Sequence, residues 1–502
     1  MVGVDSHRLS KLTEKTSHRQ VFRSSAIIGG SSVINMLIGI VKVKVLALML
    51  GPVGIGLMGL YMNVMNIAAT VAGCGIGSSG VRLVAEAADD AETLSIVRRA
   101  LWLGSLILGV AGMAALWLLR EPVALWVFGD VAHAGEVSWL GVGLLLTLIA
   151  GSQNSVLQGL RRIGDLAKVG ILSALVGALV GILTVYLLGT DGVLWFVIAA
   201  PAANFLAAGY YAARLPRPKL PYDIIAIRQQ WLAILKLGIP LMSAGLLMLA
   251  TPLVVRSIVL RELGLEASGF FQAAWAISFT YVGFVLNAMS MDFFPRLTTA
   301  IGERKRAGKL VNEQMEMGLL LAGPALLAMI TFAPWVIHLL YAESFSPAAQ
   351  LLSWQVLGDI LKVASWPMTY IFLAAGRGRT YISIQIIWSA AYLGTFIPGV
   401  SEWGLVMAGA GFAAGHLCLF CVTVIAAKQL IGFKPSGRNV FYTVLLLLAG
   451  GLTIFLASVS AIVSYAAGSL AVALFGLYSF NRLNHLIDLT GLLRQRFGGR
   501  QL

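Results

Sequence analysis

Fourteen apolar stretches, each long enough to cross a lipid bilayer, fill most of this chain of 502 residues. The chain is 58% hydrophobic and only 12% charged, and its mean hydropathy is +0.86. A bilayer core about 30 Å thick is crossed by roughly 20 apolar residues in a helix. The sequence therefore predicts an all-α polytopic membrane protein. The expected spans are 25–48, 57–78, 99–119, 138–159, 169–188, 192–213, 236–260, 268–291, 315–340, 350–374, 380–400, 403–427, 440–458 and 461–480.

The positive charges fall on alternate sides of these stretches. If the N-terminus is cytoplasmic, the inner segments hold thirty of the 36 Lys and Arg residues, whereas the outer loops hold only Arg120 and Arg261. Cytoplasmic loops of membrane proteins carry such an excess. We therefore expect a multi-pass membrane protein with both termini in the cytoplasm. The excess of basic over acidic residues reflects this topology and contact with anionic membrane lipids, so no nucleic-acid partner is expected.

The spans and loops disfavour several other functional classes. Residues 1–22 are polar and basic and have no apolar core, so no cleaved signal peptide is expected. Cys74, Cys418 and Cys421 all lie in spans, where packing is a better explanation than a disulfide, redox centre or metal site. No segment outside the spans is long enough for a soluble catalytic domain. We expect no metal, no cofactor and no enzymatic activity.

A proline-rich basic break at residues 214–222 (RLPRPKLPY) separates six spans from the other eight. The segments after the first and seventh spans begin at Gly51 and Gly264, and this weak repeat is parallel. The pattern predicts two six-helix lobes around a central cavity, plus two extra C-terminal helices. The expected parts are a basic cytoplasmic tail (1–24), an N-lobe (25–213), a cytoplasmic inter-lobe linker (214–235), a C-lobe (236–427), two additional spans (440–480) and a basic cytoplasmic tail (481–502).

Charged residues inside the expected spans are the first candidates for function, because each costs roughly 2.5–3.5 kcal/mol in mid-span on insertion scales. Lys42 shares a helical face with Asn35 in the first span, whereas Lys44 lies off that face and can snorkel outward. Asn63 lies on a polar face of the second span. Hydrogen bonding between helices is the favoured role of that face, and Asn63 remains a candidate for substrate contact.

Two later spans carry the remaining charges. Arg256 lies in the outer third of the seventh span. The tenth span has a polar stripe that includes Gln355, Asp359 and Lys362. Asp359 and Lys362 can neutralise each other at i, i+3; alternatively, Lys362 meets an anionic ligand and Asp359 sets its charge or couples transport to an ion. Because cations dominate these buried charges, the sequence favours an anionic ligand such as phosphate or pyrophosphate.

Three segments resemble a known family. Residues 50–59 (LGPVGIGLMG) and 75–86 (GIGSSGVRLVAE) resemble the opening of bacterial O-antigen and enterobacterial-common-antigen translocases, and residues 346–367 (SPAAQLLSWQVLGDILKVASWP) are similar to a longer block of the same proteins. These are Wzx-type polysaccharide flippases of the multidrug/oligosaccharidyl-lipid/polysaccharide exporter superfamily. The resemblance implies a two-lobe fold with alternating access. It also implies a place in the bacterial inner (cytoplasmic) membrane and transport of an undecaprenyl-pyrophosphate-linked oligosaccharide from the cytoplasmic to the periplasmic leaflet.

By the same resemblance, Lys42, Arg256 and Lys362 are the candidates for holding the pyrophosphate. A polymerase and a chain-length regulator of the same pathway are candidate partners. The family usually has twelve spans, so the pair at 440–480 is a departure; fourteen occur in lipid II flippases of the same superfamily. The alternatives are therefore a lipid II flippase, a cation or drug exporter of the same fold and, less in keeping with the short outer loops, a membrane glycan polymerase or ligase.

Overall fold

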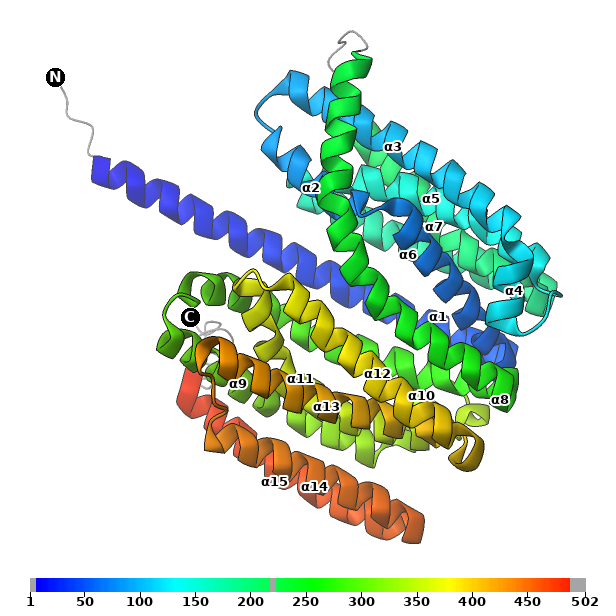
Figure 1. Ribbon diagram of the computed structural model, residues 1–502, viewed down its shortest axis with the longest axis vertical. Helices are drawn as coiled ribbons and strands as arrows, with labels where there is room; N and C mark the ends of the chain where they lie inside the picture. The colour runs from blue at the N-terminus through cyan, green and yellow to red at the C-terminus, as the bar shows by residue number, and fades with distance from the viewer. Residues whose placement is uncertain (1–5, 217–222, 488–502) are drawn as a thin grey trace, which may run out of the picture. The chain divides into compact units, whose positions relative to one another are not determined.

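The computed structural model describes residues 6–216 and 223–487, and all regular structure in these ranges is helical (Figure 1). The side chains described begin at residue 29. Part of the expected inter-lobe linker, 217–222, and most of the expected C-terminal tail, 488–502, lie outside the described residues.

The helices follow one another with short connections. In the first half they are α1 (Ser6–Gly73), α2 (Ile76–Glu86), α3 (Ala91–Leu118), α4 (Arg120–Phe128), α5 (Ala134–Gly159), α6 (Ile163–Leu188), the short η1 (Gly189–Asp191) and α7 (Gly192–Ala213). In the second half they are α8 (Ile224–Ala300), α9 (Arg304–Thr331), α10 (Ala333–Leu340), the short η2 (Glu343–Phe345), α11 (Ala348–Ala374), α12 (Gly378–Trp403), α13 (Val406–Ile431), α14 (Gly437–Val459) and α15 (Ala461–Ile487).

Eleven helical segments of the described chain are long and apolar enough to cross a membrane, which confirms a multi-pass, all-α membrane protein. Three of them, 29–73, 163–213 and 249–290, contain 45, 51 and 42 residues. At 1.5 Å per residue each exceeds twice the thickness of a bilayer core, so each has the length for two crossings. The predicted number of fourteen is compatible with these lengths and stays a prediction.

The chain divides into two compact units. Unit 1 comprises residues 1–50 and 57–253, and unit 2 comprises residues 51–56 and 254–502. The expected lobes, linker and additional spans stay predictions, because this grouping follows packing rather than membrane topology. Each unit is described by itself below.

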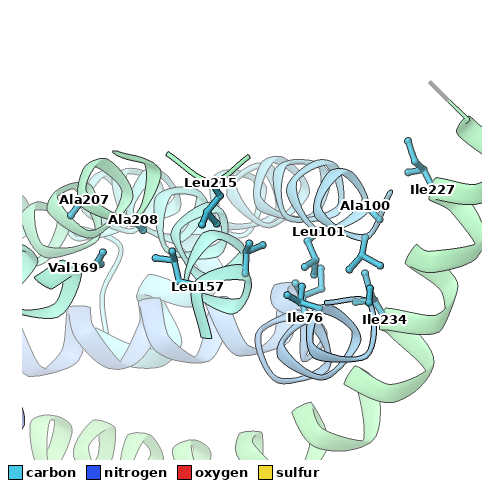
Figure 2. Close-up of a cluster of buried hydrophobic side chains, with 14 residues drawn as sticks. Ile76, Ala100, Leu101, Leu157, Val169, Ala207, Ala208, Leu215, Ile227 and Ile234 are labelled. Carbon is cyan, nitrogen blue, oxygen red and sulfur yellow. The ribbon is translucent and has the colours of Figure 1, made fainter. Parts of the chain in front are cut away.

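Unit 1 is built around α5, which packs against α2, α3 and α7, while α6 packs along α7. Its buried cluster draws on these helices and on the first turns of α8. Figure 2 shows Ile234 of α8 beside Ile76 of α2 and Leu101 of α3. Leu157 and Ala208 extend the cluster along α5 and α7. Asp90 starts α3 as an N-cap, since its side chain accepts the backbone N–H of Glu92 at 3.0 Å.

Unit 2 is built around α11, which packs against α9 and α13, and α12 packs mainly against α13. The C-terminal pair α14 and α15 packs on α9. Polar contacts fix this pair: Arg482 of α15 forms an ion pair with the buried Glu316 of α9 at 3.1 Å, and Asn439 of α14 donates to the backbone oxygen of Asn312 at 2.9 Å. The two C-terminal helices are therefore docked by specific hydrogen bonds as well as by apolar contact.

Gly51 and Gly264, the first residues of the repeated segments, interrupt α1 and α8 in the same way. Their backbone angles are φ 61°, ψ −168° and φ 89°, ψ 173°, in a region that only glycine adopts readily. Within unit 2 the two segments approach closely through glycines. A Cβ on Gly56 would lie 2.5 Å from the carbonyl oxygen of Leu265, and a Cβ on Gly269 would overlap the carbonyl oxygen of Pro52. The repeated segments therefore share a conformation and pack backbone to backbone.

Candidate functional site

Lys42 lies in the α1 portion of unit 1 and is half-buried. Its Nζ stands 5.4 Å from the centroid of the Phe196 ring on α7, within the range of a cation–π contact. Two amides of α1 have polar atoms inside the same unit. Asn35 Oδ1 and Asn63 Nδ2 are buried and have no hydrogen-bond partner. A polar ligand or water could complete both amides, because a buried polar atom is costly to leave without a partner.

Asp359 and Lys362 of α11 form the second charged group, in unit 2. The Asp359 side chain is fully buried, and its Oδ1 lies 3.7 Å from Lys362 Nζ. The other carboxylate oxygen accepts a hydrogen bond of 2.5 Å from the Ser278 hydroxyl of α8. Lys362 remains 27% exposed. The pair expected from the i, i+3 spacing therefore forms, and the lysine side chain stays partly exposed.

Aromatic rings flank Lys362. Its Nζ lies 5.8 Å from the centroid of Phe279 and 6.0 Å from that of Phe412. A buried histidine, His416, lies next to Phe412. Its Nδ1 accepts a hydrogen bond of 3.1 Å from Trp388 Nε1. A cation set among rings is less hydrated than one in water, so it attracts an anion more strongly.

Arg256 has different partners in the same unit. It is 2% exposed, donates to Gln272 Oε1 and lies 5.5 Å from the centroid of the Phe271 ring. Tyr341, which follows α10, is within its electrostatic reach; burial raises the pKa of the Tyr341 hydroxyl, and the positive charge of Arg256 opposes that rise. Tyr341 therefore stays neutral and available as a hydrogen-bonding group.

The structure thus brings together some of the sequence-predicted residues. Asp359 and Lys362 are in contact, Arg256 lies in the same unit with its own partners, and Lys42, Asn35 and Asn63 belong to unit 1. In the described residues no group of three or more His, Cys, Asp or Glu could hold a metal ion. What the arrangement offers chemically is fixed positive charge beside aromatic rings, which suits the binding of an anion rather than bond making.

Sequence reasoning missed Ser278 and the Trp388–His416 pair. Ser278 lies 81 positions before Asp359, and no spacing rule links residues on different helices. Trp388 lies 28 positions before His416 on another helix, so only the packing of α13 on α12 shows this partner.

A comparison with protein families decides where the chain belongs. The family described as polysaccharide biosynthesis protein matches residues 45–350, which is more than half of the chain. The chain belongs to that family. In this polysaccharide biosynthesis family member, the matched range includes Arg256 but ends before Asp359 and Lys362.

Two relatives of this family member have names that describe transport. The lipid III flippase of Escherichia coli (strain K12) is 24% identical over 389 residues, which covers 72% of this chain and 88% of the relative. The succinoglycan biosynthesis transport protein ExoT of Rhizobium meliloti (strain 1021) is 23% identical over 409 residues, which covers 78% of this chain and 75% of the relative.

Solved structures establish the fold of the family member. The lipid II flippase MurJ in an inward closed conformation matches with a TM-score of 0.67 and 11% identity, over 91% of this chain and 99% of that one. An inward-facing multidrug resistance MATE family transporter of the MOP superfamily matches with a TM-score of 0.62 and 20% identity, over 79% and 94% of the two chains. The chain is thus a multi-pass protein of the inner membrane with the fold of these transporters.

Proposed function

We propose that this protein is a flippase that moves an undecaprenyl-pyrophosphate-linked oligosaccharide, an O-antigen or common-antigen repeat unit, from the cytoplasmic to the periplasmic leaflet. The observation that carries the proposal is the presence of cations beside aromatic rings in spans of a polysaccharide biosynthesis protein. Arg256 is buried, and Lys42 and Lys362 are partly buried. The names of the relatives, a lipid III flippase and a succinoglycan transport protein, support this substrate class. The protein acts as a transporter and not as an enzyme.

In this proposal the three cations hold the pyrophosphate during passage. Arginine can clasp phosphate oxygens through two parallel N–H bonds, and lysine supplies a point charge. Asn35 and Asn63 have buried amide atoms that can meet sugar hydroxyls or phosphate oxygens. Asp359 is the candidate for coupling, because it is a buried carboxylate whose charge is balanced by Lys362.

The proposed transport cycle follows from the resemblance to Wzx-type polysaccharide flippases. Alternating access exposes the substrate first to one side of the membrane and then to the other. Both termini lie in the cytoplasm in this proposal, because the Lys and Arg excess falls on their side. A polymerase and a chain-length regulator would then act on the product in the periplasm.

A second candidate is export of a cationic drug by the same fold. The observation that favours it is Asp359, whose buried carboxylate could attract a cation. Its ion pair with Lys362 weighs against this role, because the lysine repels a cationic ligand at the same place. Movement of lipid II is a third candidate, supported by the likeness to MurJ, which concerns the fold alone.

A substrate panel in proteoliposomes tests the proposal. The purified protein is reconstituted with a fluorescent undecaprenyl-pyrophosphate oligosaccharide, with fluorescent lipid II or with a cationic dye, and access of each probe to an external glycosidase or quencher is followed with time. We expect protein-dependent flipping of the oligosaccharide lipid in preference to the other two. Preferential movement of lipid II or of the dye would replace the substrate assignment.

A further inference from the structure

Unit 1 contains a cavity whose lining includes none of the charged residues discussed above. Its volume is about 460 Å³, and α3, α5 and α7 form its walls. Val156 of the buried apolar cluster lines it, so this packed core supports one wall. The cavity is therefore a concave space against an ordered part of the unit, with the size of a site for a small polar group.

The lining combines two guanidinium groups with neutral polar groups. Arg98 and Arg99 come from α3, while Ser152 and Gln153 come from α5. Gln153 Oε1 is buried and has no hydrogen-bond partner. A Cβ on Gly209 would lie 3.5 Å from the amide of Gln153, so the absence of a side chain at Gly209 keeps space open beside this amide. The site has the donors for an oxyanion and an acceptor for a hydroxyl.

Arg98 is held in place by the end of α7. Its Nη1 donates to the carbonyl oxygen of Pro216 at 2.8 Å and its Nη2 to that of Ala212 at 3.3 Å. These bonds cap the C-terminal turn of α7, where a positive charge is also favoured by the helix dipole. They fix the guanidinium at the cavity wall. Arg99 and Arg98 are neighbours in the chain, so positive charge is concentrated at one wall.

The cavity lies toward the start of α3 and the C-terminal ends of α5 and α7. α3 starts at Ala91, directly after the capping residue Asp90, and the lining residues of α3 fall within its first four turns. Hydrogen bonds from Thr93 and from the backbone of Glu92 lower the pKa of Asp90. The N-terminal end of α3 therefore carries an exposed, ionised carboxylate. Trp102 on the wall is 46% exposed, as is common for tryptophan at the level of lipid headgroups.

We propose that this cavity binds a lipid-borne phosphate at the cytoplasmic surface. Basic pockets between transmembrane helices on this side suit phosphorylated headgroups, and arginine pairs with phosphate in two-point geometry. The phosphate can belong to an anionic phospholipid or to an undecaprenyl pyrophosphate that waits for transport. The cytoplasmic assignment rests on the proposed function and orientation, whereas binding of the phosphate itself does not.

The test measures lipid binding to the purified full chain in detergent by native mass spectrometry. The probes are phosphatidylglycerol, undecaprenyl pyrophosphate, phosphatidylcholine and inorganic pyrophosphate. We expect a phosphate-bearing anionic lipid to bind tightly and Arg99→Gln to weaken it about tenfold or more. The matched control is Arg162→Gln, which removes an exposed cation of the same unit that pairs with Asp165 at 2.8 Å. The control should bind as the wild type does.

The probes separate the sources of the phosphate. If Arg99→Gln weakens the binding of phosphatidylglycerol alone, the cavity is a phospholipid site. If it weakens the binding of undecaprenyl pyrophosphate, the cavity is a site where the substrate waits for transport. Equal competition by inorganic pyrophosphate assigns a free anion and overturns the lipid-borne source. Equal affinity of Arg99→Gln and Arg162→Gln for every probe also overturns the proposal.

A second measurement does not depend on a variant that folds. Photoreactive phosphatidylglycerol and photoreactive undecaprenyl pyrophosphate are cross-linked to the wild-type protein, and the attached peptides are mapped. We expect attachment within 95–103 and 152–156, and attachment confined to other segments contradicts the site. Flipping is assayed in parallel, so loss of the proposed function with cross-linking retained leaves the binding site standing.

Discussion

The carboxylate of Asp359 and the ammonium group of Lys362 lie 3.7 Å apart, one turn along α11, with the aspartate fully buried and the lysine 27% exposed. The lysine therefore compensates a charge that could not remain alone in an apolar span. Because the lysine also reaches the surface of the unit beside Phe279 and Phe412, one residue serves both stability and the proposed binding of an anion.

Removal of Lys362 alone should destabilise the protein more than removal of both charges. Lys362→Met leaves Asp359 buried without its counter-charge, and we expect a loss of roughly 2 kcal/mol or more, since breaking a buried pair is costly. In the double variant Asp359→Asn/Lys362→Met the charge is gone, so part of this loss should return. Thermal unfolding of the purified protein in detergent measures both. A double variant less stable than Lys362→Met would show that the pair does not act in this way.

The contact between the repeated segments should tolerate no side chain at Gly269. A Cβ there would overlap the carbonyl oxygen of Pro52, so Gly269→Ala forces the backbones apart and should cost about 1–3 kcal/mol. Gly283→Ala is the matched control on the same helix, because nothing lies within 4 Å of its Cβ position. We expect the control to unfold at or above the wild-type temperature. Equal effects of the two substitutions would refute the close approach.

Asn312 should be the residue that holds the C-terminal helix pair most specifically. Its Nδ2 donates to the Lys434 carbonyl oxygen at 3.0 Å, and its Oδ1 accepts from the Ser436 backbone at 2.7 Å. Asn312→Ala removes these bonds and leaves polar groups without partners, which should cost about 1–3 kcal/mol. Limited proteolysis of the 432–436 connection should become faster. Ser458→Ala, at the exposed end of α14, is the control, and a cleavage rate no faster in Asn312→Ala than in this control would contradict the role of Asn312.

The proposed orientation predicts opposite labelling of two introduced cysteines. Thr190 and Gly302, the two positions tested, are both exposed. With Cys74, Cys418 and Cys421 replaced by alanine, Thr190→Cys in η1 should react with an impermeant maleimide in intact cells. Gly302→Cys, between α8 and α9, should react only after the membrane is permeabilised. The reverse pattern would invert the topology and with it the proposed direction of transport.

The apolar pattern predicted the helices well where one span forms one helix. The expected spans 138–159 and 350–374 correspond to α5 (Ala134–Gly159) and α11 (Ala348–Ala374), because burial in lipid requires a continuous apolar helix. The break at Gly51 falls between the first two expected spans, 25–48 and 57–78, because the backbone there leaves the helical conformation.

The candidate site was predictable only along each helix. The spacing of Asp359 and Lys362 indicated that they could pair, and they do. The hydroxyl of Ser278 on Asp359 depends on how α8 meets α11, which no periodicity encodes. In the sequence, Arg98 and Arg99 are two of the many basic residues of the expected cytoplasmic segments. Their place on a cavity wall depends on the packing of α3, α5 and α7.

The central claim is that cations within the spans carry a lipid-linked pyrophosphate across the membrane. The initial rate of flipping of a fluorescent undecaprenyl-pyrophosphate oligosaccharide tests it most directly. Wild type is compared with Lys42→Gln/Arg256→Gln/Lys362→Gln and with Arg296→Gln, an exposed arginine paired with Asp292 at 2.9 Å. All are reconstituted at equal density after folding is verified. We predict flipping by wild type and Arg296→Gln, and a triple variant at the rate of protein-free liposomes. A triple variant as fast as wild type would contradict the account.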